Sequence, residues 1–308
     1  MLNSIVFPGQ GSQYLGMGKY LYDNFKVSKD VFKEVDEALG QKLTQIIFGE
    51  NQDDLNLTAN TQPAIMTVSV ATFKALEEEK GLKISDFKYC AGHSLGEYSA
   101  LVLANSLRLS DSAKILKKRG EAMQSAVAVG KGAMAAVLNI EIAELEVFIN
   151  QQKYKSVQIS NDNCPGQCVI SGEKSDVENT ALLLKNELNK KSINLPVSAP
   201  FHCDMMKPAA DELKSFIKQF SMTSPEIPFV SNVSAKPETE IEKIQDLLIE
   251  CVFSRVRWRE IVSFFIKDGI TKLIECGPGK ALTNMTKRFD SQINSVKIDN
   301  LDDLKKYE

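Results

Sequence analysis

The chain has 308 residues, 43% of them hydrophobic and 25% charged, so it is long enough to bury a core and too apolar for a disordered protein. Its 37 lysines and arginines against 40 acidic residues give a formal net charge of −3, which argues against nucleic acid or an anionic membrane as the main partner. The only histidines are His93 and His202, and the six cysteines form no C-x-x-C pair, so we expect no metal site.

The first residues, the lack of a long apolar run and the cysteines indicate the cellular compartment of the protein. The first residues lack the basic and apolar stretches of a signal peptide, and no run reaches the roughly 20 apolar residues of a membrane span. Scattered cysteines are typical of free thiols in a reducing compartment. We therefore expect a cytoplasmic protein with no membrane partner and no cofactor.

The first predicted element is a buried strand over residues 2–7, which runs into the turn-rich segment 8–13. The pair Gly9-x-Gly11 is only part of a dinucleotide-binding fingerprint, because no third glycine follows at the required spacing. A helix over residues 62–80 and a β-like run over residues 87–91 come next. This order favours an α/β fold.

The strongest motif is Gly92-His-Ser-Leu-Gly96, a G-x-S-x-G sequence between the β-like run and a predicted helix over residues 97–105. In this setting the motif predicts a nucleophile elbow, a sharp turn with the serine exposed at its tip. The glycines are needed because side chains at both positions would collide across the turn. Ser94 would then lie at a helix N-terminus, beside backbone N–H groups that can stabilise an oxyanion.

The next predicted helix has Ser110 as its N-cap and Asp111 in its first turn. It places Ile115, Arg119 and Met123 on one stripe. An arginine on an apolar stripe either caps the edge of a core or lines a cleft, where its planar fork suits a carboxylate. From the residues alone, the structural and the substrate-binding roles of Arg119 are equally supported.

The middle of the chain has a pattern of its own. It predicts strand, helix, strand, strand, helix and strand over residues 133–138, 142–151, 156–160, 167–171, 175–189 and 193–197. This βαββαβ order is the signature of a ferredoxin-like unit. We expect residues 127–198 to be a ferredoxin-like subdomain inserted into an α/β domain made of residues 1–126 and 199–308.

A serine nucleophile needs a base, and the chain offers two imidazoles. His93 adjoins Ser94, and neighbouring side chains near a strand end point apart, so His93 is poorly placed. His202 lies in a loop-like segment just after the insert, and we expect it to be the base. A main-chain carbonyl can orient an imidazole as an acid does. The acids that would have to do so lack a recognisable strand-end setting: Asp111, Asp162 and Asp176.

Beyond His202 the pattern predicts a strand over residues 228–233, a helix over 243–253 and a strand over 273–275. Between them, Arg255-Val-Arg-Trp-Arg259 holds three of the chain's arginines and its only tryptophan. Its alternation fits a strand or the start of a helix, and we expect a solvated basic face. Docking of an acidic partner is the alternative.

Motifs found in order along nearly the whole chain are Phe7-Pro-Gly-Gln-Gly-Ser-Gln13, Thr61-Gln-Pro-Ala64, Gly92-His-Ser-Leu-Gly-Glu-Tyr-Ser99, Arg119-Gly-x-x-Met-Gln124, Asn161-x-Asn-x-Pro-Gly-Gln167, Pro200-Phe-His202, Ser231-Asn-Val233 and Gly277-Pro-Gly-Lys280. With these motifs the chain resembles the malonyl-CoA:acyl carrier protein transacylases of fatty acid synthesis. The resemblance implies an α/β fold: an α/β-hydrolase-like large domain with an inserted ferredoxin-like (βαββαβ) small subdomain.

The resemblance also implies roles for individual residues. Ser94 becomes the nucleophile and His202 its base, and the backbone amides of Gln10 and Leu95 form the oxyanion hole. Arg119 becomes the clamp for the malonyl carboxylate. The implied partners are malonyl-CoA and holo acyl carrier protein, and we expect a monomer.

Further residues follow from the same resemblance, which places Gln62 near the acyl pocket and Asn161 and Asn163 near the pantetheine arm. Phe201, directly before the histidine, is similar to the malonyl-selecting form of the family. Cys251 stands where the family commonly has a glutamine whose main-chain carbonyl orients the histidine. Since a backbone carbonyl does not depend on the side chain, we expect this orientation to survive.

The implied reaction is a ping-pong transfer of the malonyl group through a malonyl-Ser94 ester, which supplies extender units for fatty acid synthesis; the sequence does not separate this pathway from polyketide synthesis. An esterase or thioesterase with the same elbow is the closest alternative, and an arginine facing the acyl pocket argues against it. A non-catalytic protein that binds acyl carriers is a further alternative, against which intact Ser94, His202 and Arg119 argue.

Overall fold

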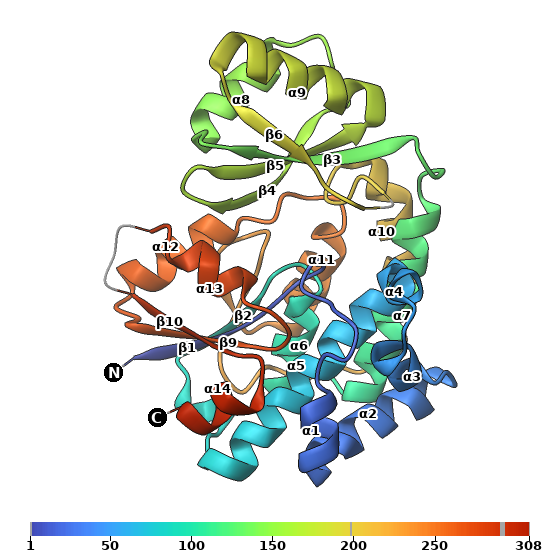
Figure 1. Ribbon diagram of the computed structural model, residues 1–308, viewed down its shortest axis with the longest axis vertical. Helices are drawn as coiled ribbons and strands as arrows, with labels where there is room; N and C mark the ends of the chain where they lie inside the picture. Colours follow the sequence, from blue (N-terminus) through green and yellow to red (C-terminus); the bar gives the residue numbers. More distant parts are fainter. Residues whose placement is uncertain (1, 198, 290–292, 308) are drawn as a thin grey trace.

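The computed structural model describes residues 2–197, 199–289 and 293–307. Its larger unit is built on a six-stranded sheet in the order β10-β9-β1-β2-β7-β8 (Figure 1). The central strands are β1 (Asn3–Phe7) and β2 (Tyr89–Gly92), with β9 (Lys272–Cys276) and β10 (Asn294–Ile298) on one side and β7 (Phe229–Val230) on the other, all parallel. The short β8 (Pro237–Glu238) pairs antiparallel with β7. Strands that lie far apart in sequence are thus neighbours in this sheet.

The helix α5 (Thr58–Lys80) fills the core of the larger unit, and its residues are buried on every side through most of its length. Helices α2 (Lys26–Leu39) and α7 (Leu109–Ser125) pack against it, and α6 (Gly96–Leu103) joins it to the sheet. The remaining helices of this unit are α1 (Lys19–Asn24), α3 (Leu43–Phe48), α4 (Gln52–Asn56), α10 (Lys207–Ile217), α11 (Ile241–Glu250), α12 (Trp258–Lys267), α13 (Ala281–Thr286) and α14 (Leu301–Lys306).

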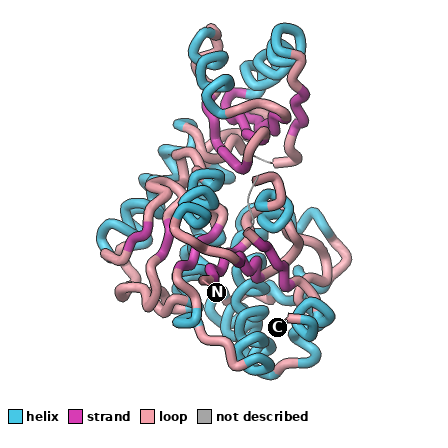
Figure 2. The backbone as a smooth tube through the Cα atoms, turned by 90° about the vertical axis from the view of Figure 1, so that its left-hand side faces the viewer, coloured by secondary structure: helices cyan, strands magenta, loops and turns pink. Residues whose placement is uncertain are grey.

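The smaller unit lies over one end of the larger one (Figure 2). In chain order it contains β3 (Gly132–Leu138), α8 (Ile142–Gln151), β4 (Gln158–Cys164), β5 (Gln167–Glu173), α9 (Lys174–Leu188) and β6 (Lys191–Asn194). The four strands form an antiparallel sheet in the order β4-β5-β3-β6, and the two helices cover one face. The predicted βαββαβ order and the α/β fold class are confirmed; the exact domain limits stay a prediction.

Several predicted limits differ from the structure by a few residues, and three of these differences have a physical reason. Ser110 is not an N-cap: α7 starts at Leu109, because the Ser112 N–H donates to the Arg108 carbonyl and closes the first turn earlier. The strand β6 ends at Asn194, before Pro196, which has no N–H for the ladder. The strand β7 is shorter than predicted because the chain leaves the sheet after Val230 and turns toward the nucleophile elbow.

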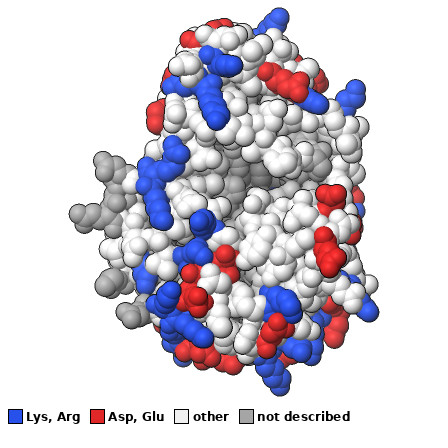
Figure 3. Space-filling model, in the orientation of Figure 1, with Lys and Arg blue, Asp and Glu red and all other residues white. Residues whose placement is uncertain are grey.

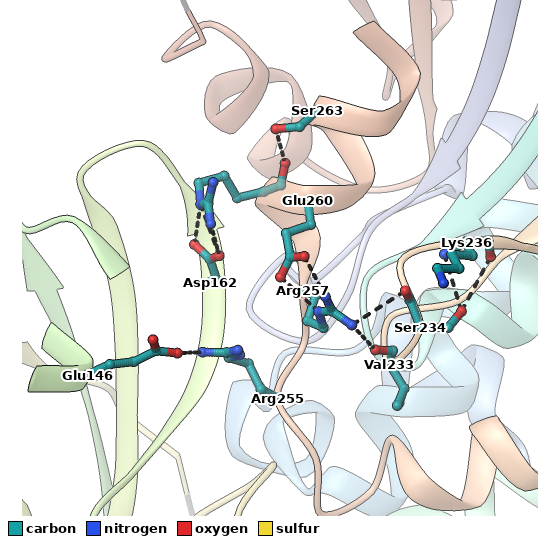
Figure 4. A network of polar contacts seen from close by, with 10 residues as sticks. Glu146, Asp162, Val233, Ser234, Lys236, Arg255, Arg257, Glu260 and Ser263 are labelled. Carbon is teal, nitrogen blue, oxygen red and sulfur yellow. Dashed lines mark hydrogen bonds and ion pairs between the residues drawn. The ribbon is translucent and has the colours of Figure 1, made fainter. Parts of the chain in front are cut away.

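A row of polar contacts joins the two units (Figure 4). Val256 of the larger unit pairs with β4, the edge strand of the smaller sheet, through a parallel bridge. Its N–H donates to the Ser160 carbonyl at 2.8 Å, and its carbonyl accepts from the Asp162 N–H at 2.9 Å. The Asp162 carboxylate, only 1% exposed, accepts from Arg259 Nη2 at 2.8 Å, and Arg255 pairs with Glu146 at 2.5 Å.

The basic segment 255–259 is therefore built into the joint between the two units. Its remaining arginine, Arg257, pairs with Glu260 at the start of α12. The three arginine side chains are 27–34% exposed and each has an acidic partner, so the segment is a partly solvated face whose charges are paired, and not the fully solvated basic face of the prediction. Within the described ranges, no helix is both long enough and apolar enough to cross a membrane.

Candidate active site

A cavity of about 300 Å³ lies between the two units. The larger unit contributes Gln10, Gln62, Ser94, Arg119, Phe201 and His202 to its lining, and the smaller unit contributes Asn161 and Asn163. In the space-filling view the surface is recessed between the units, with lysine and arginine side chains gathered along one side of this face (Figure 3). The lining runs from Gln10 to Met285, so residues up to 275 positions apart in sequence meet in one cleft.

The turn at Ser94 has the geometry of a nucleophile elbow. It connects β2 to α6, and Ser94 has a φ of 53°, in the left-handed region that residues other than glycine rarely adopt. A Cβ atom on Gly92 would overlap the backbone of Gly96, and one on Gly96 would overlap the Phe7 carbonyl. The close approach of three backbone segments therefore explains both glycines of the motif.

Ser94 and His202 form a hydrogen-bonded pair. Ser94 Oγ lies 2.9 Å from His202 Nε2, and both residues are buried. On the other side of the ring, His202 Nδ1 lies 2.6 Å from the Cys251 carbonyl. A carbonyl only accepts, so Nδ1 carries the proton and Nε2 is left to accept from the serine hydroxyl. The imidazole thus has the tautomer that a general base needs.

The protonation state of His202 fits the same role. Burial, followed by the positive charge of Arg119, lowers the pKa of His202 to about 3, so the ring is neutral near pH 7. Among the residues that the structure describes, no acid orients it: Asp162 pairs with Arg259, and Asp176 accepts from the Ser156 hydroxyl. His202 itself has a φ of 58°, so both members of the pair hold a rare backbone conformation.

Arg119 lines the cleft and does not cap the edge of the core. Its side chain is 2% exposed; Nη1 donates to Gln62 Oε1 at 2.8 Å, and Nη2 donates to Ser94 Oγ at 3.1 Å. Ile115 and Met123 are buried on the same helix, as the predicted stripe requires. A buried guanidinium beside the reactive oxygen is suited to bind a carboxylate that arrives with the acyl group.

Two backbone N–H groups are available to hold an oxyanion. At the elbow, the Ser94 N–H donates to Asn232 Oδ1 at 2.7 Å, and the Gly96 N–H donates to the His93 carbonyl. In the part of the chain that the structure describes, the N–H groups of Leu95 and Gln10 have no hydrogen-bond partner. These are the two amides that the resemblance assigns to the oxyanion hole.

The smaller unit brings two asparagines to the cleft. Asn161 and Asn163 lie on the same side of β4, two residues apart, and both line the cavity. Asn163 Oδ1 lies 3.0 Å from His93 Nε2, and the His93 ring packs on Trp258 with ring centroids 5.8 Å apart. His93 is therefore engaged with the smaller unit and makes no contact with the Ser94 hydroxyl among the described residues.

Two buried residues next to the site were not identified from the sequence. Asn232 and Glu97 are 0% and 1% exposed, and both hydrogen-bond around the elbow. Their only signal was membership of the motifs Ser231-Asn-Val233 and Gly92-His-Ser-Leu-Gly-Glu-Tyr-Ser99. Across residues 2–197, 199–289 and 293–307, no cluster of three or more potential metal ligands occurs.

The sequence matches the acyl transferase domain family over residues 5–298. It is 42% identical over 297 residues to the malonyl CoA-acyl carrier protein transacylase of Bacillus subtilis, which covers 96% of this chain and 92% of that protein. The solved acyl-carrier-protein S-malonyltransferase of Bartonella henselae has a TM-score of 0.95 and 42% identity, with 99% of this chain and 98% of that one covered. A malonyl-transacylase solved with its holo type II polyketide carrier protein has a TM-score of 0.94 and 36% identity, with 99% and 98% covered.

Proposed function

This chain belongs to the family of malonyl CoA-acyl carrier protein transacylases, and we propose that it transfers a malonyl group from malonyl-CoA to the phosphopantetheine thiol of holo acyl carrier protein. The product supplies extender units for fatty acid synthesis. The observation that carries the proposal is Arg119, whose buried guanidinium lies 3.1 Å from Ser94 Oγ. A neutral acyl group has no use for a charge at this position, whereas the free carboxylate of a malonyl thioester does.

In the first half-reaction, Ser94 Oγ gives its proton to His202 Nε2 and attacks the thioester carbonyl carbon. The negative charge that develops on the carbonyl oxygen is held by the N–H groups of Leu95 and Gln10. The carbon–sulfur bond then breaks, and the proton on His202 passes to the departing thiolate of coenzyme A. A malonyl-Ser94 ester remains, and its carboxylate is bound by the guanidinium of Arg119. Gln62 lies beside that guanidinium.

In the second half-reaction, the carrier protein's thiol gives its proton to His202 Nε2 and attacks the malonyl-Ser94 carbonyl. The same N–H groups hold the oxyanion, and the proton returns from His202 to Ser94 Oγ as the ester bond breaks. Asn161 and Asn163 line the cavity, and we expect them to contact the pantetheine arm. Phe201, 6% exposed, narrows the acyl pocket and so favours malonyl over bulkier extender units.

Initial-rate kinetics with malonyl-CoA and holo acyl carrier protein test the proposal. A malonyl-enzyme intermediate predicts parallel double-reciprocal plots and, in the absence of carrier, slow release of free malonate. Intersecting plots would contradict the intermediate, and hydrolysis as fast as transfer would indicate the thioesterase alternative. A fatty acid carrier that is no better an acceptor than a polyketide carrier would contradict the pathway. The monomeric state and the cytoplasmic location stay predictions; light scattering tests the first.

A further inference from the structure

The side chain of Asn232, in the turn that follows β7, spans the nucleophile elbow. Its Oδ1 accepts from the Ser94 N–H at 2.7 Å, and its Nδ2 donates to the Gly92 carbonyl at 2.6 Å. Gly92 and Ser94 flank His93, so a single side-chain amide hydrogen-bonds the backbone on both sides of the turn. Asn232 does not line the cavity, so its side chain acts on the elbow and not on a substrate.

Asn232 is itself held on both sides of its backbone. Its N–H donates to Glu97 Oε1 at 2.7 Å, and its carbonyl accepts from the Arg257 N–H at 3.0 Å. Glu97 belongs to the first turn of α6, the helix that starts at the elbow. The contacts therefore form a closed loop that runs from the elbow to Asn232, from Asn232 to Glu97, and from Glu97 through the helix back to the elbow.

Glu97 also lies beside Cys251, the residue whose carbonyl orients the other member of the pair, His202. The Cys251 thiol lies beside Glu97 and Arg119, and burial, followed by the Glu97 charge, raises the pKa of this thiol. The Cys251 carbonyl accepts from the Nδ1–H of His202. All of these residues are at most 5% exposed. Glu97 therefore accepts a hydrogen bond from Asn232, which holds the backbone of Ser94, and it also lies beside Cys251, which orients His202.

A brace is needed because the elbow is strained. With a φ of 53°, Ser94 persists in its conformation only where surrounding contacts impose it. The direction of the Leu95 N–H depends on the same turn, because that amide follows Ser94 in the chain. By accepting the Ser94 N–H, Asn232 also leaves Leu95 as the elbow amide that is free to hold an oxyanion.

We propose that Asn232, held by Glu97, is a positioning residue for Ser94: it fixes the backbone that aims Oγ at His202 and the Leu95 N–H at the developing oxyanion. The inference rests on the proposed function only in that Ser94 is the nucleophile. Loss of the brace lowers the reactivity of Ser94 and kcat, and it leaves the KM for malonyl-CoA nearly unchanged because no substrate contact is removed.

The test measures the reaction of Ser94 with phenylmethylsulfonyl fluoride, in which Oγ bonds to sulfur, fluoride leaves and His202 takes the proton. This reagent carries neither a carboxylate nor a pantetheine arm. In Asn232→Leu we expect sulfonylation and kcat to fall by about 100-fold, the scale of a small misplacement of reacting atoms. The KM for malonyl-CoA should stay within about threefold of the wild type. The matched control is Ser28→Ala, which removes a buried hydrogen bond to the Ala71 carbonyl far from the site and should leave both rates unchanged.

If Asn232→Leu does not fold, the pair Glu97→Ala and Glu97→Gln replaces it. Glutamine keeps an acceptor for the Asn232 N–H and should retain sulfonylation within about threefold, whereas alanine should lose most of it. Sulfonylation at the wild-type rate in Asn232→Leu, or equal rates in the two Glu97 variants, overturns the inference. A wild-type protein that is not sulfonylated at Ser94 would instead overturn the nucleophile of the proposed function.

Discussion

Replacing Arg119 with alanine should change which acyl group the protein transfers, and should not simply abolish transfer. The guanidinium is 2% exposed, and its two terminal nitrogens now donate to Gln62 and Ser94. A malonyl carboxylate in the cavity would accept from the same nitrogens. In Arg119→Ala that carboxylate enters a buried site without a charged partner, whereas an acetyl group loses nothing that it used.

The size of the effect follows from the two bonds. A hydrogen bond to a charged group contributes about 1.5 to 3 kcal/mol, so losing two lowers kcat/KM for malonyl-CoA by roughly 150- to 25,000-fold. The base is not weakened by the change. Because the charge of Arg119 is one of the causes that lower the pKa of His202, its removal raises that pKa and makes Nε2 more basic. We therefore expect acetyl transfer within about tenfold of the wild type.

The assay compares transfer from malonyl-CoA and from acetyl-CoA to holo acyl carrier protein, with each variant checked for its melting temperature. Lys118→Ala is the matched control, because Lys118 lies on the same helix, does not line the cavity and pairs with Glu212 of α10. It should change neither rate. An equal loss of malonyl and acetyl transfer in Arg119→Ala would refute the assignment of Arg119 as the carboxylate clamp.

Three further predictions follow from the site and the joint between the units. Cys251→Ala should keep kcat within about threefold, because the Cys251 main-chain carbonyl orients His202; a loss of about 100-fold would show that the side chain is needed. Since the pKa of His202 is lowered to about 3, kcat/KM should show no acid limb near pH 6.5, the ordinary value for histidine, and a limb there in a pH–rate profile would contradict a neutral buried base. Arg259→Gln leaves the buried Asp162 carboxylate unpaired and should lower the free energy of unfolding in urea by about 3 kcal/mol. Arg255→Gln breaks the more exposed pair with Glu146 and should cost less than about 1 kcal/mol. Equal losses in the two variants would contradict the role of Asp162 as a buried, paired carboxylate.

The parts of the site that depend on neighbouring residues in sequence were predictable. The elbow needs a strand, two glycines, a serine and a helix within a short segment, and all of these can be read from the sequence. The pairing of Ser94 with His202 spans 108 positions, and it could be predicted only because the chain has so few imidazoles. The βαββαβ order of the smaller unit was visible for a similar reason, since hydrophobic periodicity is local.

The parts that depend on which strands lie side by side could not be predicted. Asn232 reaches the elbow because β7 is the neighbour of β2 in the sheet, and no local pattern contains that fact. Arg259 looked like surface charge because its partner, Asp162, lies 97 positions away in the other unit. The N-cap of α7 was wrong for a smaller reason: the Arg108 carbonyl closed the first turn before Ser110 could cap it.

Mass spectrometry of the intact protein after exposure to malonyl-CoA tests the central claim most directly. We predict a malonyl adduct on the peptide that contains Ser94, which disappears when holo acyl carrier protein is added and appears there as malonyl carrier. Ser94→Ala should show no adduct. An adduct on another residue, or an adduct on Ser94 that water removes as fast as the carrier does, would contradict transfer through a malonyl-Ser94 ester.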